Sequence, residues 1–129
     1  MKPKFKTYGL THIALAVKDV KRSVDFYHKV FGTITMYLKD GTAQIQTPGT
    51  NDIIVFEENK RLAGKVNGGI LHFGFRLIKA SYINKAIKAV EAAGGKIKER
   101  GEFVPGEPYV FFYDPDGYEI EIWYEKIDD

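Results

Sequence analysis

The chain has 129 residues and contains no cysteine. This absence excludes a disulfide framework, a thiolate zinc site, an iron–sulfur cluster and a cysteine nucleophile. Imidazole and carboxylate groups are therefore the strong metal ligands that remain. Histidine is also scarce, with three copies at His12, His28 and His72, so the positions of these residues carry much of the information about chemistry.

An excess of one charge and long hydrophobic runs are missing too. The 19 Lys and Arg nearly balance the 17 Asp and Glu, giving a net charge of +2, which is too small to indicate nucleic-acid binding. No apolar run approaches the roughly 20 residues that span a bilayer, and no signal-peptide pattern is visible. The 44% hydrophobic content argues against disorder. We expect one soluble, cytoplasmic domain that binds a small molecule and neither nucleic acid nor membrane.

The first half of the chain reads as a strand, a helix and three strands. Residues 10–17 alternate between two faces, as a strand does, with His12 inside it. Apolar residues at helical spacing predict a helix over 20–31, with Asp19 as its N-cap and Gly32 at its C-terminal end. Further strands are expected at residues 34–39, 42–47 and 52–57.

The same order returns after a polar, glycine-bearing linker at residues 59–69. The expected elements are a strand at 70–77, a helix at 81–93, and strands at 96–99, 109–113 and 118–124. The chain is thus one domain made of two modules, the first at about 8–58 and the second at 70–125. A single module would leave one face of its sheet uncovered, so the two can pack together or pair with modules of a second chain.

His12 and His72 occupy equivalent positions in the two modules, and each lies in a predicted strand with apolar neighbours. Glu121 lies in the last predicted strand. Two imidazoles and one carboxylate form the facial triad that many divalent metals use, with positions left for water and substrate. The alternative is a pair of hydrogen-bonded core histidines, and spacing alone does not decide between the two.

Three segments carry a family resemblance: THIALAVKDVKRSVDFYHKVFG at 11–32, LHFGFRL at 71–77 and FFYDPDGYEIEIWYE at 111–125. In these the chain resembles the vicinal oxygen chelate superfamily, which includes glyoxalase I, extradiol dioxygenases, fosfomycin-resistance transferases and bleomycin-binding proteins. The resemblance implies an α+β fold of two βαβββ modules that form a cupped, mostly antiparallel sheet. It also implies a divalent Fe, Mn, Zn, Ni or Co ion held by His12, His72 and Glu121, with Glu121 catalytic.

Differences between this chain and each subfamily narrow the range of reactions that the resemblance implies. Glyoxalase I has a fourth ligand, which is a glutamate, where this chain has Val55, although Glu57 could supply it after a register slip. Extradiol dioxygenases need a further histidine, and His28 is the one left, on a helix where a partly exposed position is expected. Residues 109–112 do not match the anion-binding residues of fosfomycin transferases. Bleomycin-type binders lack the three ligands.

The sequence therefore favours a metal-dependent enzyme acting on a small oxygenated substrate, with a lyase or isomerase reaction preferred. The alternative is a non-catalytic protein that binds or sequesters a small molecule. A homodimer is expected, because exposed sheet edges favour pairing and the family completes its site from two modules, sometimes from two chains. Residues that could line the substrate cavity, if they are not core, are Tyr37, Gln44, Phe75, Tyr109, Phe111 and Trp123.

Overall fold

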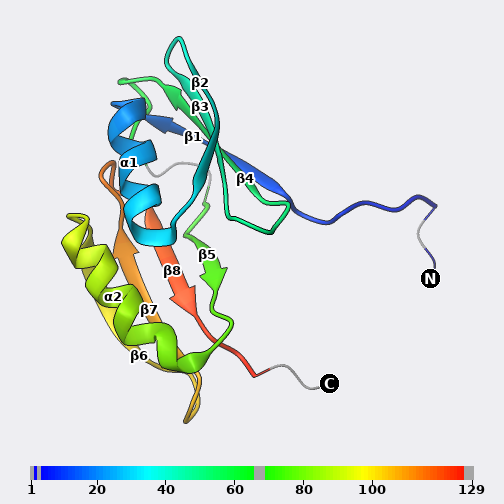
Figure 1. Cartoon of the computed structure of the whole chain (residues 1–129), viewed down its shortest axis with the longest axis vertical. Coiled ribbons are helices and arrows are strands. Elements are labelled where there is room, and N and C mark those ends of the chain that lie inside the picture. The colour runs from blue at the N-terminus through cyan, green and yellow to red at the C-terminus, as the bar shows by residue number, and fades with distance from the viewer. Residues whose placement is uncertain (1, 3, 66–68, 127–129) are drawn as a thin grey trace.

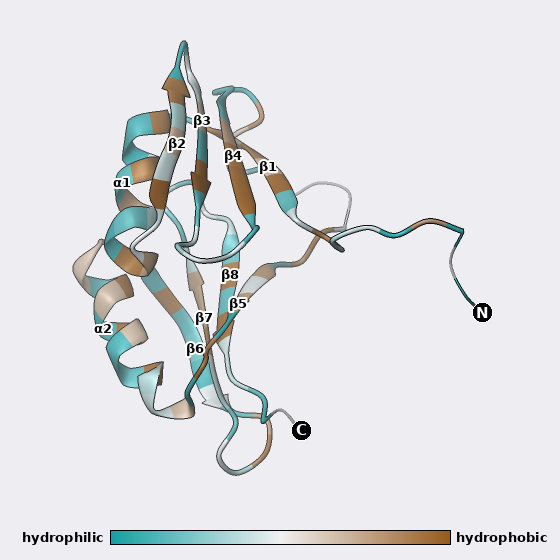
Figure 2. Ribbon diagram, turned by 45° about the vertical axis from the view of Figure 1, so that its right-hand side comes forward, coloured by the Kyte–Doolittle hydropathy of each residue, from teal (hydrophilic) through white to brown (hydrophobic). Residues whose placement is uncertain are grey.

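The computed structural model describes residues 2, 4–65 and 69–126 and contains two four-stranded sheets with two helices (Figure 1). Positions 66–68 of the predicted linker lie outside this description. The helices lie on one side of the sheets, as Figure 2 shows, and the other side of each sheet carries no helix. No helix in the described part of the chain has the length and apolar character needed to cross a bilayer.

The first module has the predicted element order. It consists of β1 (His12–Val17), α1 (Val20–Phe31), β2 (Ile34–Lys39), β3 (Thr42–Gln46) and β4 (Ile53–Glu58). The strand order is β1-β4-β3-β2, with β1 parallel to β4 and the other pairs antiparallel. The predicted ends of α1 are confirmed, because the Asp19 side chain accepts hydrogen bonds from two backbone N–H groups and Gly32 adopts a left-handed φ of 67°.

The second module repeats this arrangement. Its elements are β5 (Phe73–Arg76), the 3-10 turn η1 (Ala80–Tyr82), α2 (Ile83–Ala92), β6 (Lys96–Glu102), β7 (Pro108–Tyr113) and β8 (Glu119–Trp123). The strand order β5-β8-β7-β6 is equivalent to that of the first sheet, again with one parallel pair, β5 with β8. The predicted α+β fold of two βαβββ modules is therefore confirmed.

The start of β5 differs from the prediction, which placed a strand at 70–77 with His72 inside it. The observed strand begins at Phe73, which pairs with Ile120 of β8. Because β8 begins at Glu119, directly after a turn, residues 70 and 71 have no strand to pair with. His72 therefore lies just before β5, on a segment that the sheet does not hold.

The core lies between the helices and one face of each sheet. Tyr27 of α1 is fully buried at its centre, with its ring 5.2 Å from that of Phe56 and 5.5 Å from that of Phe26. In β7, Val110 and Phe112 are fully buried and their neighbours in the strand are half-buried. This alternation means that each sheet packs one face on the helices and leaves the other face open.

The turn between β7 and β8 joins the two modules. Its Asp116 carboxylate is completely buried and accepts a hydrogen bond from the Lys18 N–H at 2.9 Å, from Arg22 at 3.0 Å and from the Ser23 hydroxyl at 3.3 Å. All three donors belong to the first module, at or near the start of α1. The acidic turn that resembles the family motif therefore has a structural role in this chain.

Candidate functional site

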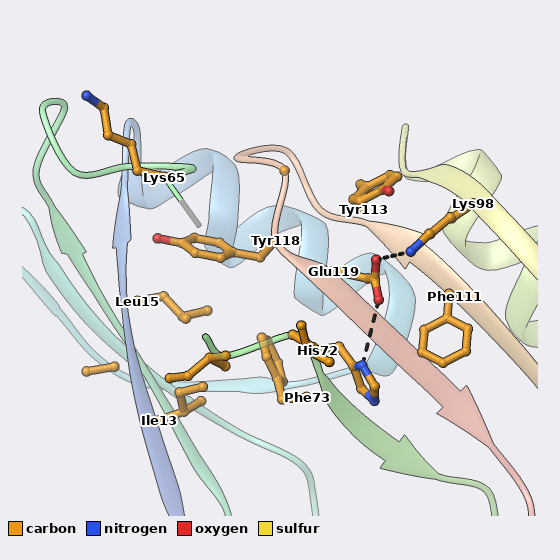
Figure 3. A pocket seen from close by; sticks show the side chains of 14 residues that line it. Ile13, Leu15, Lys65, His72, Phe73, Lys98, Phe111, Tyr113, Tyr118 and Glu119 are labelled. Carbon is orange, nitrogen blue, oxygen red and sulfur yellow. Dashed lines mark hydrogen bonds and ion pairs between the residues drawn. The ribbon is translucent and has the colours of Figure 1, made fainter. Parts of the chain in front are cut away.

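His72 lies between two glutamates on the open face of the second sheet. Its Nε2 is 3.6 Å from Oε1 of Glu121, and its Nδ1 is 3.7 Å from Oε2 of Glu119. Figure 3 shows the ring below Glu119 and beside Phe111. The Phe111 ring meets the His72 ring edge-on, with centroids 4.9 Å apart. The histidine side chain is 34% exposed and that of Glu121 is 12% exposed, so the pair is accessible from the open face.

Strand alternation explains why these groups meet. In β8, Ile120 and Ile122 point into the core, so Glu119 and Glu121 lie on the other face. Phe73 pairs with Ile120, which places the preceding residue, His72, alongside the beginning of β8. Trp123 shares the face of the two glutamates, because it too alternates with the buried residues of β8.

The electrostatics of this face favour a cation beside Glu121. Partial burial raises the pKa of its carboxyl above the ordinary value, and a positive charge on His72 opposes that shift. Glu119 already has a positive partner, since Lys98 Nζ donates to its Oε1 at 2.6 Å. This hydrogen bond raises the pKa of Lys98 and keeps its charge.

The donor atoms of His72 and Glu121 fit a shared divalent ion. Two ligand atoms that are each about 2.1 Å from one cation lie roughly 3.0–3.5 Å apart. The observed separation of 3.6 Å between Nε2 and Oε1 is close to that range, and a neutral imidazole with a carboxylate is a common donor pair for such ions. These two residues could hold a metal after a small adjustment of their side chains.

His12, the third ligand implied by the resemblance, is not in this group. It is the first residue of β1, in the other sheet, and its side chain is exposed. No three His, Asp or Glu side chains among the described residues are gathered so that they could hold one ion together. Within one chain, the structure thus brings together His72 and Glu121 but leaves His12 apart.

The remaining ligand candidates lie elsewhere in the first module. Val55 pairs with Ala14, whereas Glu57 pairs with Ala16, four positions along β1 from His12. At about 3.3 Å per residue this places the Glu57 backbone roughly 13 Å from that of His12. His28 is exposed on α1, as expected, and its Nδ1 is 2.8 Å from the Thr33 carbonyl oxygen. Neither arrangement supports a role as a ligand.

The predicted substrate-lining residues lie on the open faces of the two sheets, with one exception. In the second sheet, Tyr109, Phe111 and Trp123 are on the same face as Glu121, because they alternate with buried residues of β7 and β8. In the first sheet, Tyr37 pairs with Gln44. Gln44 pairs in turn with Val55, so this group lies on the open face that carries His12.

Phe75 is the exception. Its ring stacks on that of Phe31 in α1, with centroids 3.8 Å apart, so it packs on the helix side of the sheet. The sequence offered Phe75, like Phe111 and Trp123, as a residue that could line the substrate cavity if it is not part of the core. Strand alternation explains the difference, since Phe75 pairs with the buried Ile122 and therefore shares its face.

A cavity of about 630 Å³ lies between the two modules and reaches His72. It is lined mainly by apolar and aromatic side chains from β1, β7 and the segment that precedes β5, together with Lys98 and Glu119 (Figure 3). The sequence analysis assigned no function to Lys98 or Glu119. The alternation of β8 was the available signal for Glu119, whereas no local signal places Lys98 beside it.

Comparisons with known proteins agree with the observed fold and identify the family. A family model described as the Glyoxalase/Bleomycin resistance protein/Dioxygenase superfamily matches residues 9–122. The chain is 29% identical over 121 residues to the probable trivalent organoarsenical cleaving enzyme of Bacillus subtilis (strain 168), which covers 89% of this chain and 79% of that protein. It is 25% identical over 115 residues to the glutathione transferase FosA of Serratia marcescens, and this match covers 88% of this chain and 79% of that protein.

Solved structures are similar over nearly the whole chain. The fosfomycin resistance protein FosX from Listeria monocytogenes superposes with a TM-score of 0.77 at 22% identity, covering 95% of this chain and 97% of that one. A mutant of that protein has been solved in complex with Mn(II) and a dihydroxypropylphosphonic acid. The fold, the repeated module and the family match together show that this chain belongs to the glyoxalase/bleomycin resistance/dioxygenase superfamily.

Proposed function

We propose that the protein is a divalent-metal-dependent enzyme that acts on a small oxygenated substrate, with a lyase or isomerase reaction preferred. The observation that carries this proposal is the convergence of His72 Nε2 and Glu121 Oε1 on an open, aromatic sheet face. A cation held there would polarise a substrate oxygen and stabilise the negative charge that develops on it.

We propose further that His12 reaches this ion from a second copy of the chain, in a homodimer. Each sheet has an open face and a free edge strand, β1 in one and β5 in the other. Large apolar side chains next to both histidines are exposed: Leu10 is 99% exposed and Leu71 is 76% exposed. Such apolar surface favours burial against a partner, and pairing the first module of one chain with the second module of another would bring His12 toward His72.

The chain's own residues then have separable roles. His72, Glu121 and the second chain's copy of His12 would hold the ion. Phe111 and Trp123 offer an aromatic surface on the same face, where they would bind and orient the substrate body and exclude water. The resemblance also makes Glu121 the candidate catalytic group, because a carboxylate next to the substrate can accept a proton.

The organoarsenical compound and the phosphonic acid that are named for similar proteins do not suit the residues of this chain. Trivalent arsenic is a soft, thiol-seeking centre, and this chain has no cysteine to bind it. Lys98, one of the two lysines that line the cavity, is already bonded to Glu119, and the carboxylates of Glu119 and Glu121 would repel a phosphonate that approaches this face. We therefore favour a substrate that presents oxygen atoms to the metal without a phosphonate group.

A non-catalytic binding protein is the second candidate. The observation that favours it is the group of aromatic rings on the open face, where Phe103 stacks on Tyr109 at 4.3 Å and Tyr109 meets Phe111 edge-on at 5.5 Å. Such a surface could bind a flat or cationic ligand without a metal. This protein would bind the same ligands equally well with and without a divalent ion.

Metal analysis tests the first proposal. The protein should be purified without chelator, analysed for bound metals, and titrated with Mn²⁺ by calorimetry. We expect one high-affinity site per chain in the wild type, loss of that site in His72→Ala, and no change in His28→Ala, a control histidine outside the site. Absence of binding, or equal binding by wild type and His72→Ala, would contradict the proposal.

A further inference from the structure

We propose that Glu119 is the positioning residue that orients the His72 ring, and that Lys98 in turn fixes Glu119. This inference rests on the proposed metal site, because it assigns to Glu119 the selection of the nitrogen that His72 presents to the ion. The line of three side chains runs across the open face of the second sheet, from β6 through β8 to the segment that precedes β5 (Figure 3).

The contacts divide the Glu119 carboxylate between two partners. Its Oε1 accepts a hydrogen bond from Lys98 Nζ at 2.6 Å, while its Oε2 lies 3.7 Å from His72 Nδ1. The opposite nitrogen of the ring, Nε2, is the one that faces Glu121. Each nitrogen of the ring thus has its own carboxylate, and the two carboxylates lie on different sides of it.

A neutral histidine ligates through the nitrogen that carries no proton. Glu119 beside Nδ1 favours a proton on that nitrogen, whereas Glu121 beside Nε2 favours a proton on Nε2, so the two carboxylates compete. Glu119 thereby increases the share of rings whose Nε2 lone pair is free to face Glu121. A carboxylate in this position also raises the basicity of the ligating nitrogen. Glu119 therefore prepares the ring to bind an ion between Nε2 and Glu121.

His72 needs such support because its backbone lies outside the strand ladder. β5 begins one residue later, and Phe111 meets the ring edge-on. Such packing does not fix which nitrogen faces which carboxylate, and misorientation of a metal ligand weakens binding. Glu119, with its Oε2 at 3.7 Å from Nδ1, supplies an electrostatic contact on the side of the ring opposite to Glu121.

Lys98 compensates the negative charge of Glu119. Glu119 and Glu121 lie on the same face of the same strand, so their negative charges repel each other. The Lys98 ammonium compensates one of them and holds Oε1, which leaves Oε2 directed at His72. If the Lys98–Glu119 pair were only a surface ion pair, its loss would change neither the tautomer of His72 nor metal affinity.

The first experiment uses the full chain without metal. Long-range ¹H–¹⁵N NMR of the histidine side chains, recorded over a series of pH values, reports the tautomer of each neutral ring. We expect the share of His72 rings with the proton on Nδ1 to be smaller in Glu119→Leu than in the wild type, because Glu121 is then the carboxylate that remains beside the ring. His28 serves as the internal control, and its spectrum should not change.

The second experiment measures Mn²⁺ affinity by calorimetry. We expect Glu119→Leu to bind about 10–100-fold more weakly than the wild type, Lys98→Met to be weakened to a smaller extent, and Lys96→Met, on the same strand, to bind like the wild type. Circular dichroism confirms that each variant is folded. An unchanged His72 tautomer in Glu119→Leu, or an affinity within about twofold of wild type, overturns the inference.

The two experiments separate this inference from the function on which it rests. If the wild type binds no divalent ion, the proposed function fails in the calorimeter. The tautomer measurement needs no metal, so it still decides whether Glu119 orients His72.

Discussion

The buried carboxylate of Asp116, in the turn before the last strand, is bound by Arg22 of the first helix at 3.0 Å. The Asp116 side chain is 0% exposed and that of Arg22 is 43% exposed. The Arg22 side chain therefore lies on the solvent side of this ion pair, at the junction between the two modules. Ninety-four positions separate the two residues in sequence. The relative placement of the modules, and with it the distance between His12 and His72, depends on this junction.

We expect Asp116→Ala to destabilise the protein by about 2–3 kcal/mol, because it leaves buried donors of the first module without their charged acceptor. Urea unfolding followed by circular dichroism measures the change. Asp25→Ala is the matched control, since Asp25 forms an exposed ion pair with Lys29 at 2.8 Å and should cost less than about 0.5 kcal/mol. Equal losses in the two variants would show that the junction does not stabilise the fold.

The stability of the junction should depend on pH through Asp114. Burial raises the pKa of this carboxyl from 3.8 to about 6, against the opposing hydrogen bond from the Tyr27 hydroxyl. The folded protein therefore holds the proton more tightly than the unfolded chain does. The stabilisation from the protonated form is complete below pH 3.8 and is lost as the pH rises through about 6.

The measurement is the free energy of unfolding of wild type and Asp114→Asn at several values of pH. The wild type's advantage over the variant should fall by about 3 kcal/mol in all between about pH 3 and pH 7, with about 2 kcal/mol of this change between pH 4 and pH 6. A constant or rising difference across this interval would contradict the raised pKa. Comparing the two proteins removes the contribution of the other carboxyl groups.

Phe75 should behave as a core residue and not as part of the substrate face. Phe75→Ala removes the stack on Phe31, and we expect a loss of about 2–4 kcal/mol in urea unfolding. Phe103→Ala, at a 55% exposed ring that also stacks on a neighbour, should cost less than about 1 kcal/mol. A Phe75→Ala protein as stable as Phe103→Ala would return Phe75 to the list of binding residues.

The elements of the fold were predictable where their signals are local. The limits of α1 follow from the Asp19 cap and the Gly32 terminus, both of which act within one turn of helix. The start of β5 was misplaced because it is set by β8, a strand nearly fifty residues later in the chain. An apolar stretch such as 70–71 looks like a strand whether or not a partner is available to pair with it.

The site was predictable only in part, for a similar reason. Alternation within β8 places Glu119 and Glu121 on one face, and the repeat makes His12 equivalent to His72. How far apart the two histidines lie depends on how the modules pack, which includes the buried Asp116 junction. Local patterns carry no information about that packing, and the same limit applies to the pairing of Lys98 with Glu119.

Each single-ligand variant should lose the metal site when it is tested alone. His12→Ala and His72→Ala each remove one imidazole from the proposed set, and we expect Mn²⁺ affinity to fall at least about tenfold in both. Calorimetry on the purified proteins measures this loss. Retention of full affinity by His12→Ala would remove His12 from the site and leave His72 with Glu121.

The most direct test of the central claim combines these two variants in one dimer. If the site is shared between chains, a hybrid of His12→Ala and His72→Ala has one intact site and one site without either histidine. Random pairing after co-expression should then restore about one quarter of the wild-type high-affinity Mn²⁺ sites, because half of the dimers are hybrids and each regains one of its two sites. A mixture that binds no better than either variant alone would contradict a site built from two chains.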